Sequence, residues 1–385
     1  MRPFTVGIVA NEASGDLLGA AIVREMRRLF PDARFVGVAG PHMLAEGCET
    51  LFEMERLSVM GLMEVLGHLR ELLGLRRALV RYFLADPPDI FIGVDAPDFN
   101  LGLERRLRES GIRTAHLVSP TVWAWRPGRV KGIRRSVDLM LSVFPFEETF
   151  LRRHGVPATY VGHPLADEIP LEVDREAARA ALGLPSAGTV VAILPGSRVG
   201  EMQRLAAPFI ATARRCLDAR PDLRFVVPCV TPRLRAMFAD ALARLAPDLP
   251  ALLVDGHSRE AMAAADCLLT ASGTATLEGL LFKRPMVVAY RVHPISYHLV
   301  KRLGLIKVPH IAMANLLAGR ELAPELIQSR CSPELLAPAV LAFLEDPARV
   351  AEIHSEYARI HRDLRRGAAG EAARVLVDLA GSRST

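Results

Sequence analysis

LTASGTATLEG, residues Leu269 to Gly279, joins an apolar run to a turn of small residues that opens a helix. A strand that leads through a turn into a helix is the repeating unit of parallel α/β sheets. Small side chains from Ser272 to Thr276 let a ligand approach the backbone, and the first helical N–H groups attract anions. The segment predicts a phosphate-binding turn, although one such turn alone is equally consistent with a simple N-cap.

A second turn of this kind follows another apolar run at ILPGSR, residues 193–198. Arg198 provides a guanidinium suited to the paired oxygens of a diphosphate, and Glu278 lies where a ribose hydroxyl could be held. Two such turns in one half of the chain favour a nucleotide-diphosphate pocket over a cap. The predicted pocket residues are Gly196, Ser197, Arg198, Ser272, Gly273, Thr274, Ala275, Thr276 and Glu278.

Apolar runs alternate with helical patterns through both halves of the chain, which indicates parallel sheets. Strands are expected at 5–10, 34–39, 90–95, 114–119, 139–143 and 159–162, and again at 189–194, 224–228, 251–254, 267–270 and 286–290. We therefore predict an α/β protein with two facing Rossmann-like doubly wound domains, residues 1–168 and 169–345. The helical residues 346–385 are expected to return to the first domain. Ligands of such sheets bind at the carboxyl ends of the strands, so the site is expected between the domains.

The composition indicates a folded cytosolic protein. Half of the 385 residues are hydrophobic, and the net charge of +5 is too small and scattered to favour a nucleic-acid partner. The five cysteines are widely spaced in apolar surroundings, which predicts reduced core thiols rather than disulfides or a metal site. The first apolar run is too short for a signal peptide, and no run approaches the ~20 residues that span a bilayer.

The first strand is followed by Asn11-Glu12-Ala13-Ser14-Gly15-Asp16 rather than by GxGxxG, which argues against a hydride-transfer enzyme. Ser14 could simply cap the helix from Gly15 onward. Glu12 and Asp16, however, crowd carboxylates at a strand end, which favours a site for sugar hydroxyls.

GVDAPDFN, residues 93–100, places two more carboxylates at the end of a strand. Asp95 is the leading candidate for a general base, because it has no evident local task. Asp98 is more readily interpreted as the N-cap of a helix over 99–109. Trp125, in the basic segment after the next strand, suits a sugar phosphate or the packing of a ring between the domains. His163 is more readily structural than catalytic.

Residues 60–83, MGLMEVLGHLRELLGLRRALVRYF, carry a broad apolar stripe with interspersed arginines. The stripe fits a helix that lies on a membrane and fits equally a helix that covers the sheet. The predicted membrane-facing residues are Met63, Val65, Leu66, Leu69, Leu72 and Leu73.

The ordered set ANEASGD, FVGVAGPHM, GVDAPDFN, SPTVWAWRPGRV, VGHPLAD, ILPGSR, LTASGTATLEG and NLLAGRE resembles the lipid-A-disaccharide synthase family over nearly the whole chain. This resemblance implies a glycosyltransferase fold of the B type and a role in lipid A biosynthesis in a Gram-negative bacterium. The second domain would bind UDP-2,3-diacylglucosamine, and the first would bind 2,3-diacylglucosamine 1-phosphate. The products would be a β-linked disaccharide 1-phosphate and UDP.

The same resemblance assigns roles to single residues. Asp95 would take a proton from the 6-hydroxyl of the acceptor, Arg198 would neutralise the departing diphosphate, and Asn315 would help to hold the donor. Residues near the acceptor would be Glu12, Ser14, Asp16, Asp98 and Trp125. No metal or cofactor is required, and diacylated substrates imply peripheral association with the anionic inner-membrane surface. Two alternatives stay open, a nucleotide-sugar 2-epimerase and a non-catalytic nucleotide-binding module at the membrane surface, and so does a homodimer.

Overall fold

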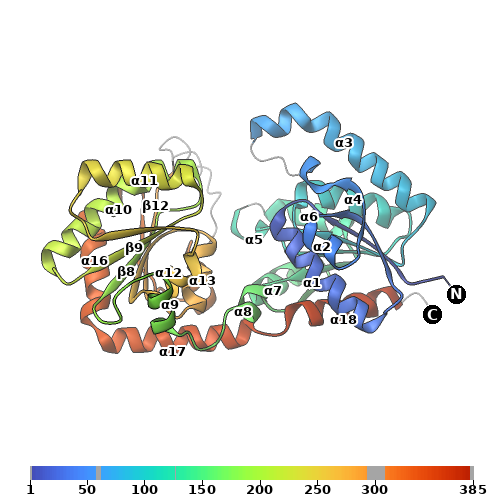
Figure 1. Ribbon diagram of the computed structural model, residues 1–385. Helices are drawn as coiled ribbons and strands as arrows, with labels where there is room; N and C mark the ends of the chain where they lie inside the picture. The colour runs from blue at the N-terminus through green and yellow to red at the C-terminus, as the bar shows by residue number, and fades with distance from the viewer. Residues whose placement is uncertain (1, 58–61, 126, 293–307, 382–385) are drawn as a thin grey trace. The chain divides into compact units, whose positions relative to one another are not determined.

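The computed structural model describes residues 2–57, 62–125, 127–292 and 308–381. The chain divides into two compact units (Figure 1). The first unit runs to Asp167 and resumes at Leu364, and the second consists of Glu168–Asp363.

The first unit is built on a parallel sheet of seven strands in the order β3-β2-β1-β4-β5-β6-β7. Its strands are β1 (Thr5–Ala10), β2 (Arg34–Ala39), β3 (Glu49–Glu53), β4 (Ile90–Val94), β5 (Thr114–Leu117), β6 (Leu139–Ser142) and β7 (Ala158–Tyr160). The order reverses between β1 and β4, which makes the carboxyl ends of these two strands the switch point where doubly wound sheets bind ligands.

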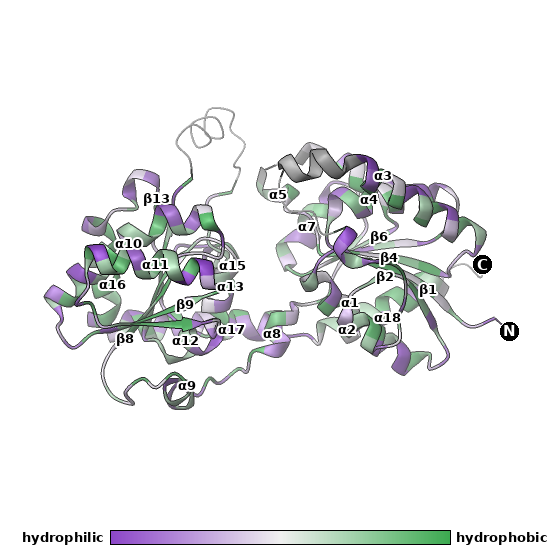
Figure 2. Ribbon diagram, turned by 45° about the horizontal axis from the view of Figure 1, so that its top comes forward, coloured by the Kyte–Doolittle hydropathy of each residue, from purple (hydrophilic) through white to green (hydrophobic). Residues whose placement is uncertain are grey.

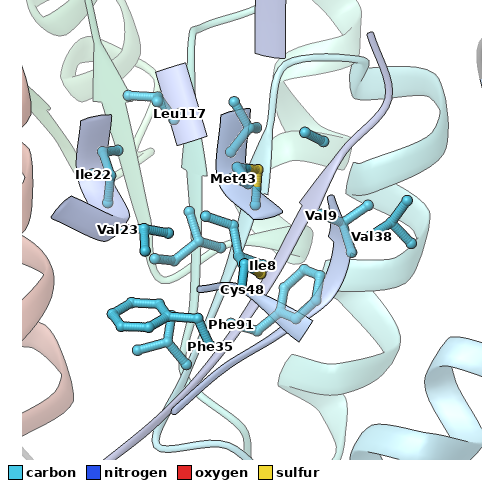
Figure 3. Close-up of a cluster of buried hydrophobic side chains, with 14 of the residues drawn as sticks. Ile8, Val9, Ile22, Val23, Phe35, Val38, Met43, Cys48, Phe91 and Leu117 are labelled. Carbon is cyan, nitrogen blue, oxygen red and sulfur yellow. The ribbon is translucent and has the colours of Figure 1, made fainter. Parts of the chain in front are cut away.

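Helices cover both faces of this sheet, as a buried parallel sheet requires. They are α1 (Ala13–Leu29), α2 (Pro41–Ala45), α3 (Leu62–Ala85), α4 (Pro97–Glu109), α5 (Val122–Trp125), α6 (Val130–Ser136), α7 (Pro145–Arg153), α8 (Pro164–Glu168) and α18 (Ala368–Gly381). Figure 3 shows the core, where Ile8 and Phe91 of the sheet lie among side chains such as Ile22 and Met43 from the helices. α18 lies against α1, and its Leu376 joins the same core.

The second unit holds a parallel sheet of six strands in the order β10-β9-β8-β11-β12-β13. Its strands are β8 (Val190–Leu194), β9 (Arg224–Cys229), β10 (Ala251–Asp255), β11 (Cys267–Ala271), β12 (Met286–Tyr290) and β13 (Glu325–Ile327). Its helices are α9 (Arg175–Ala181), α10 (Val199–Ala219), α11 (Pro232–Leu245), α12 (Ser258–Ala264), α13 (Thr274–Leu281), α15 (Met313–Ala318), α16 (Pro333–Glu345) and α17 (Pro347–Leu364). Figure 2 shows the apolar colour of strands such as β8 and β9 and the mixed faces of the helices around them. The switch point here lies between β8 and β11.

These sheets confirm the predicted doubly wound α/β fold, and α18 belongs to the first unit. The return begins at Leu364, so the boundary expected at 346 is wrong. The reason is that α17 belongs to the second unit, where Ile353 and Tyr357 are buried. All five cysteines are buried and free, as predicted.

The C-terminal half of helix α3 fits the second interpretation of residues 60–83, a helix that covers the sheet. Leu75, Leu79 and Phe83 are buried in the core of the first unit, and Leu72 packs against them. Leu73 is half-buried. The side chains of the predicted membrane-facing residues Met63, Val65, Leu66 and Leu69 lie outside the described residues. In the described part of the chain, no helix has both the length and the apolar character needed to cross a membrane.

Candidate active site

A pocket of about 230 Å³ lies at the switch point of the second sheet. β8 and β11 are neighbours there, with Leu194 opposite Thr270, so the turns that follow them meet at one edge. Eight predicted residues line this pocket, namely Gly196, Ser197, Arg198, Ser272, Gly273, Thr274, Ala275 and Glu278. Sequence reasoning missed other lining residues, among them Glu201 and Ser258.

The N-terminus of α13 offers an anion site in this pocket. Within the described part of the chain, the backbone N–H groups of Thr274 and Ala275 have no protein acceptor. Gly273 precedes them with φ +142°, a conformation that favours glycine, and the space where its Cβ would stand is empty. Two unpaired donors at the positive end of a helix attract a phosphate oxygen.

The N-terminus of α10 differs from the predicted open turn, because Glu201 occupies its donors. The Glu201 carboxylate accepts hydrogen bonds from the Ser197 N–H (3.1 Å) and the Arg198 N–H (3.3 Å), and an added Cβ on Gly196 would stand 2.4 Å from Oε2. A glutamate three residues after the N-cap is the sequence signal of this capping box. The first turn therefore supplies a side chain rather than backbone donors.

That side chain is Arg198, whose guanidinium is 80% exposed and lies 3.5 Å from Glu201 Oε1. Such an exposed pair contributes little to stability, because water screens it. The guanidinium therefore stays available to a charged ligand, and its bidentate geometry matches the oxygens of a phosphate.

Glu278 adds a half-buried carboxylate to the pocket. Burial, the largest cause, and the nearby Glu168 raise its pKa, while Arg259 opposes the shift. Its carboxylate accepts no hydrogen bond from the residues that the structure describes. A desolvated acceptor without a partner suits hydroxyl donors such as those of a ribose.

Thr276 and Asn315, which were expected to contact a ligand, form hydrogen bonds within the protein. Thr276 is buried; its hydroxyl donates to the carbonyl of Gly273 (2.8 Å) and accepts from the Met313 N–H (3.0 Å). It thereby fastens α15 to the turn before α13. Neither Thr276 nor Asn315 lines the pocket.

The buried Asn315 amide is fully engaged within its own segment. Its Oδ1 accepts from the N–H groups of Leu322 (2.8 Å) and Ala323 (2.9 Å), and its Nδ2 donates to the Ala323 carbonyl (2.7 Å) and to Glu325 Oε1 (2.8 Å). Glu325 also accepts from the Ile311 and Ala312 N–H groups. Direct donor binding by Asn315 is therefore corrected to positioning of the loop beside the phosphate turn.

In the first unit, Asp95 lies directly after β4, at the switch point. Both Asp95 (φ +52°) and Ala96 (φ +43°) adopt the left-handed region, which is strained for residues with a Cβ. The turn is held by the buried Asn100, whose Nδ2 donates to the Asp95 carbonyl (2.8 Å) and the Val94 carbonyl (3.2 Å). The half-buried Asp95 carboxylate accepts no hydrogen bond from the described residues, so it is available as a base.

Glu12 and Ser14 lie exposed at the start of α1, which begins at Ala13 after Glu12, so Ser14 is not its cap. Asp16 is fully buried and does not face a ligand. Its carboxylate accepts the backbone N–H groups of Gly40 (2.9 Å), His42 (2.8 Å) and Met43 (3.1 Å) at the N-terminus of α2. Acceptor binding by Asp16 is therefore corrected to capping of α2.

Asp98 is the second residue of α4, whose N-cap is Ala96, so the predicted capping role is wrong. Its exposed carboxylate pairs with Arg129. The side chain of Trp125 lies outside the described residues. His163 Nδ1 accepts from the Leu165 N–H (3.2 Å), and burial lowers its pKa to about 4, which supports the structural interpretation.

The neighbouring Trp123 donates its indole N–H to the buried Glu147 (3.1 Å). Burial, the largest cause, raises the pKa of Glu147 to about 8. Among the described residues, no group of three or more His, Cys, Asp or Glu side chains is arranged to hold a metal ion.

The fold defines the class. The structure resembles a UDP-N-acetylglucosamine 2-epimerase of Neisseria meningitidis bound to UDP-GlcNAc (TM-score 0.63, 12% identity, all of both chains). It also resembles the glycosyltransferase of kitacinnamycin (TM-score 0.62, 18% identity, 98% of this chain and 100% of the other). This is the B-type fold that glycosyltransferases share with nucleotide-sugar epimerases.

Sequence comparison then identifies the family. A sequence model of the lipid-A-disaccharide synthetase family matches residues 6–378, and the chain belongs to this family. It is 54% identical to the lipid-A-disaccharide synthase of Azotobacter vinelandii over 97% of this chain and 98% of that protein. It is 50% identical to the synthase of Methylobacillus flagellatus, again over 97% and 98%. The predicted family is confirmed, and these relatives favour it over the epimerase and over a non-catalytic module.

Proposed function

We propose that this protein transfers diacylglucosamine from UDP-2,3-diacylglucosamine to 2,3-diacylglucosamine 1-phosphate. The acceptor 6-hydroxyl oxygen bonds to the anomeric carbon of the donor while the bond from that carbon to the UDP oxygen breaks. The electron pair leaves with UDP, and the hydroxyl proton goes to the base. A single displacement inverts the anomeric centre and yields a β-linked disaccharide 1-phosphate.

The observation that carries this proposal is the pocket of the second unit, in which Arg198, the α13 N-terminus and Glu278 converge. Negative charge develops on the departing diphosphate. The Arg198 guanidinium and the backbone N–H groups of Thr274 and Ala275 would stabilise that charge. Glu278 would bind the ribose. At about 230 Å³ the pocket is smaller than sites that enclose a whole ligand, which suits the diphosphate and ribose while the acyl chains lie elsewhere.

Asp95 is the proposed base. Its carboxylate stands at the switch point of the first sheet, free of partners among the described residues and held by a strained turn. Glu12 and Ser14, exposed after the adjacent strand β1, are proposed to contact the acceptor, and Asp98 and Trp125 remain further candidates.

The test incubates the purified protein with both acylated substrates in detergent and detects the disaccharide by mass spectrometry. Asp95→Asn should reduce kcat about 10²- to 10⁴-fold, the usual contribution of a general base. Arg198→Ala should reduce it about 10²- to 10³-fold, as loss of one electrostatic contact does. Asp32→Asn, in an exposed turn before β2, and Arg204→Ala, exposed on α10, are the matched controls. Absence of product from the wild type, or full turnover by Asp95→Asn, would refute the proposal.

We also propose that the protein associates peripherally with the cytoplasmic face of the inner membrane through Met63, Val65, Leu66 and Leu69. The buried positions of the C-terminal half of α3 leave this N-terminal half for the role. Leu66→Gln with Leu69→Gln should reduce cosedimentation with vesicles that contain anionic lipid. The control Leu84→Gln replaces an exposed leucine at the other end of α3. Equal binding by the double variant and the wild type would exclude this surface.

A further inference from the structure

A larger cavity, of about 570 Å³, lies in the second unit away from the proposed active site. It is lined by Thr189, Asp266 and Pro285, which come directly before β8, β11 and β12. The proposed active site is lined instead by residues that follow β8, β9 and β11. Because these strands are parallel, this cavity lies at their amino ends and the proposed active site lies at their carboxyl ends.

Cationic side chains dominate one wall of this cavity. The lining includes the cations Arg175, Lys283 and Arg284, with His354 beside them, and Asp266 is its one carboxylate among the described residues. That carboxylate is already shared, because it accepts from Arg175 (2.5 Å) and from the buried Arg179 (2.8 Å). The wall therefore carries more positive than negative charge.

The arginine deepest in this wall is held by neutral groups. Arg284 donates to the carbonyls of Met262 (3.2 Å) and Ala263 (2.7 Å), near the C-terminus of α12. These bonds fix the guanidinium but leave its formal charge in place. Burial, followed by Arg175 and Arg179, lowers the pKa of Arg284 to about 10 despite Asp266. Burial, Arg284 and Lys283 likewise lower the pKa of His354, so the field at this wall is positive.

Much of the remaining lining is apolar. It consists of Phe343 and Leu344 at the end of α16 and Pro347, Val350 and Ala351 of α17. A cavity lined by both cationic and apolar side chains matches an anion that carries a compact organic body.

We propose that this cavity binds an organic phosphate, with the phosphate on Arg175, Arg284 and His354 and the organic body against Phe343 and Val350. This site is separate from the proposed UDP-sugar pocket, because the two cavities share no lining residue. The phosphate can come from a soluble metabolite or from the headgroup of a lipid.

The experiment follows the His354 ring by NMR in the full-length protein, with the resonance assigned by His354→Gln. UDP is present at saturation, so that the pocket at the α13 N-terminus is filled. The probes are inorganic phosphate, phenyl phosphate and dihexanoyl phosphatidic acid below its micellar concentration. Each should bind saturably and raise the pKa of His354, because a bound anion stabilises the imidazolium. Phenyl phosphate should bind about tenfold more tightly than inorganic phosphate, since its ring is buried.

Arg175→Gln should weaken the binding of every probe about tenfold or more, because it removes one cation from the wall. Arg362→Gln, exposed on the same helix α17 but outside the cavity, is the matched control and should bind as the wild type does. Circular dichroism checks that both variants fold. A preference for the phosphatidic acid over phenyl phosphate identifies a lipid source, and the reverse a soluble one. An unmoved His354 resonance, or equal weakening by Arg362→Gln, would overturn the proposal.

Discussion

Replacement of Asn315 by alanine separates a positioning role from direct contact with the donor. The side chain is buried and takes part in four hydrogen bonds, with Leu322, Ala323 and Glu325. Asn315→Ala removes all four and leaves the buried partners without their bonds. The loop beside the phosphate turn should then open locally, while the α13 N-terminus keeps its own donors.

The magnitude follows from the bonds. A net loss of about 0.5–1.5 kcal/mol for each gives roughly 2–6 kcal/mol for the four. Since about 1.4 kcal/mol corresponds to a tenfold change, local opening should rise between about 30-fold and about 10⁴-fold. Affinity for UDP should fall by less than this, because the pocket residues themselves are unchanged.

Hydrogen exchange of the Leu322 and Ala323 amides measures the opening, and calorimetric titration measures the affinity for UDP. Thr276→Val is the companion variant, because it removes the hydrogen bonds of the Thr276 hydroxyl with Met313 and Gly273 and leaves all four bonds of Asn315 in place. It should accelerate exchange at Met313 and leave exchange at Leu322 nearly unchanged. If Asn315→Ala abolished UDP binding while exchange at Leu322 and Ala323 stayed at the wild-type rate, the side chain would be a ligand contact and the positioning role would be wrong.

Three further predictions concern the folded structure. Asp16→Asn should lower the free energy of unfolding of the first unit by about 2–4 kcal/mol, since it replaces one accepting oxygen with a donor and removes the charge that strengthens the remaining bonds. Tryptophan fluorescence in urea measures this unit because both tryptophans belong to it. The pKa of Glu147 is raised from 4.5 to about 8, so the native state holds this proton more tightly than the unfolded state and stability should fall as pH rises from 4.5 through about 8. Glu147→Gln should flatten this dependence of the melting temperature on pH. The same dependence in the variant and the wild type would contradict the prediction. Gly196→Ala should weaken UDP binding and destabilise the second unit by more than about 1 kcal/mol, because φ is +108° and the new Cβ would meet the Glu201 carboxylate; unchanged melting and affinity would show that the turn adapts.

The strands that sequence predicts are those with continuous apolar runs. β3 and β13 escape prediction because neither carries a continuous apolar run: three of the five residues of β3 are exposed, and β13 has only three residues. A strand of this kind gains its place from its neighbour rather than from its own pattern. The domain boundary was expected at 346 rather than at Leu364 for a related reason: the sequence pattern of α17 does not indicate which unit it packs against.

The candidate site shows the same division between local and distant information. Arg198 and the turn before α13 line one pocket, as the sequence predicts, because each follows directly on a strand and the two strands are neighbours in a parallel sheet. Asp16 and Asn315 were assigned to ligands because polar residues near strand ends suggest a site. Their true partners lie elsewhere in the chain, at Gly40–Met43 and at Glu325, and a pattern of residue types does not indicate which way a side chain turns.

The two crossings of the chain between the units have a consequence for dissecting the protein. Asp167 accepts hydrogen bonds from the backbone N–H groups of Gly367 (2.9 Å) and Ala368 (2.7 Å), so the first unit is interrupted at a single place on its surface. The second unit is thus a contiguous insertion into a host. A gene in which a short glycine linker replaces the second unit, between Asp167 and Leu364, should encode a first unit that folds by itself. A fragment that stops at Asp167 would lack α18, the helix that packs on α1.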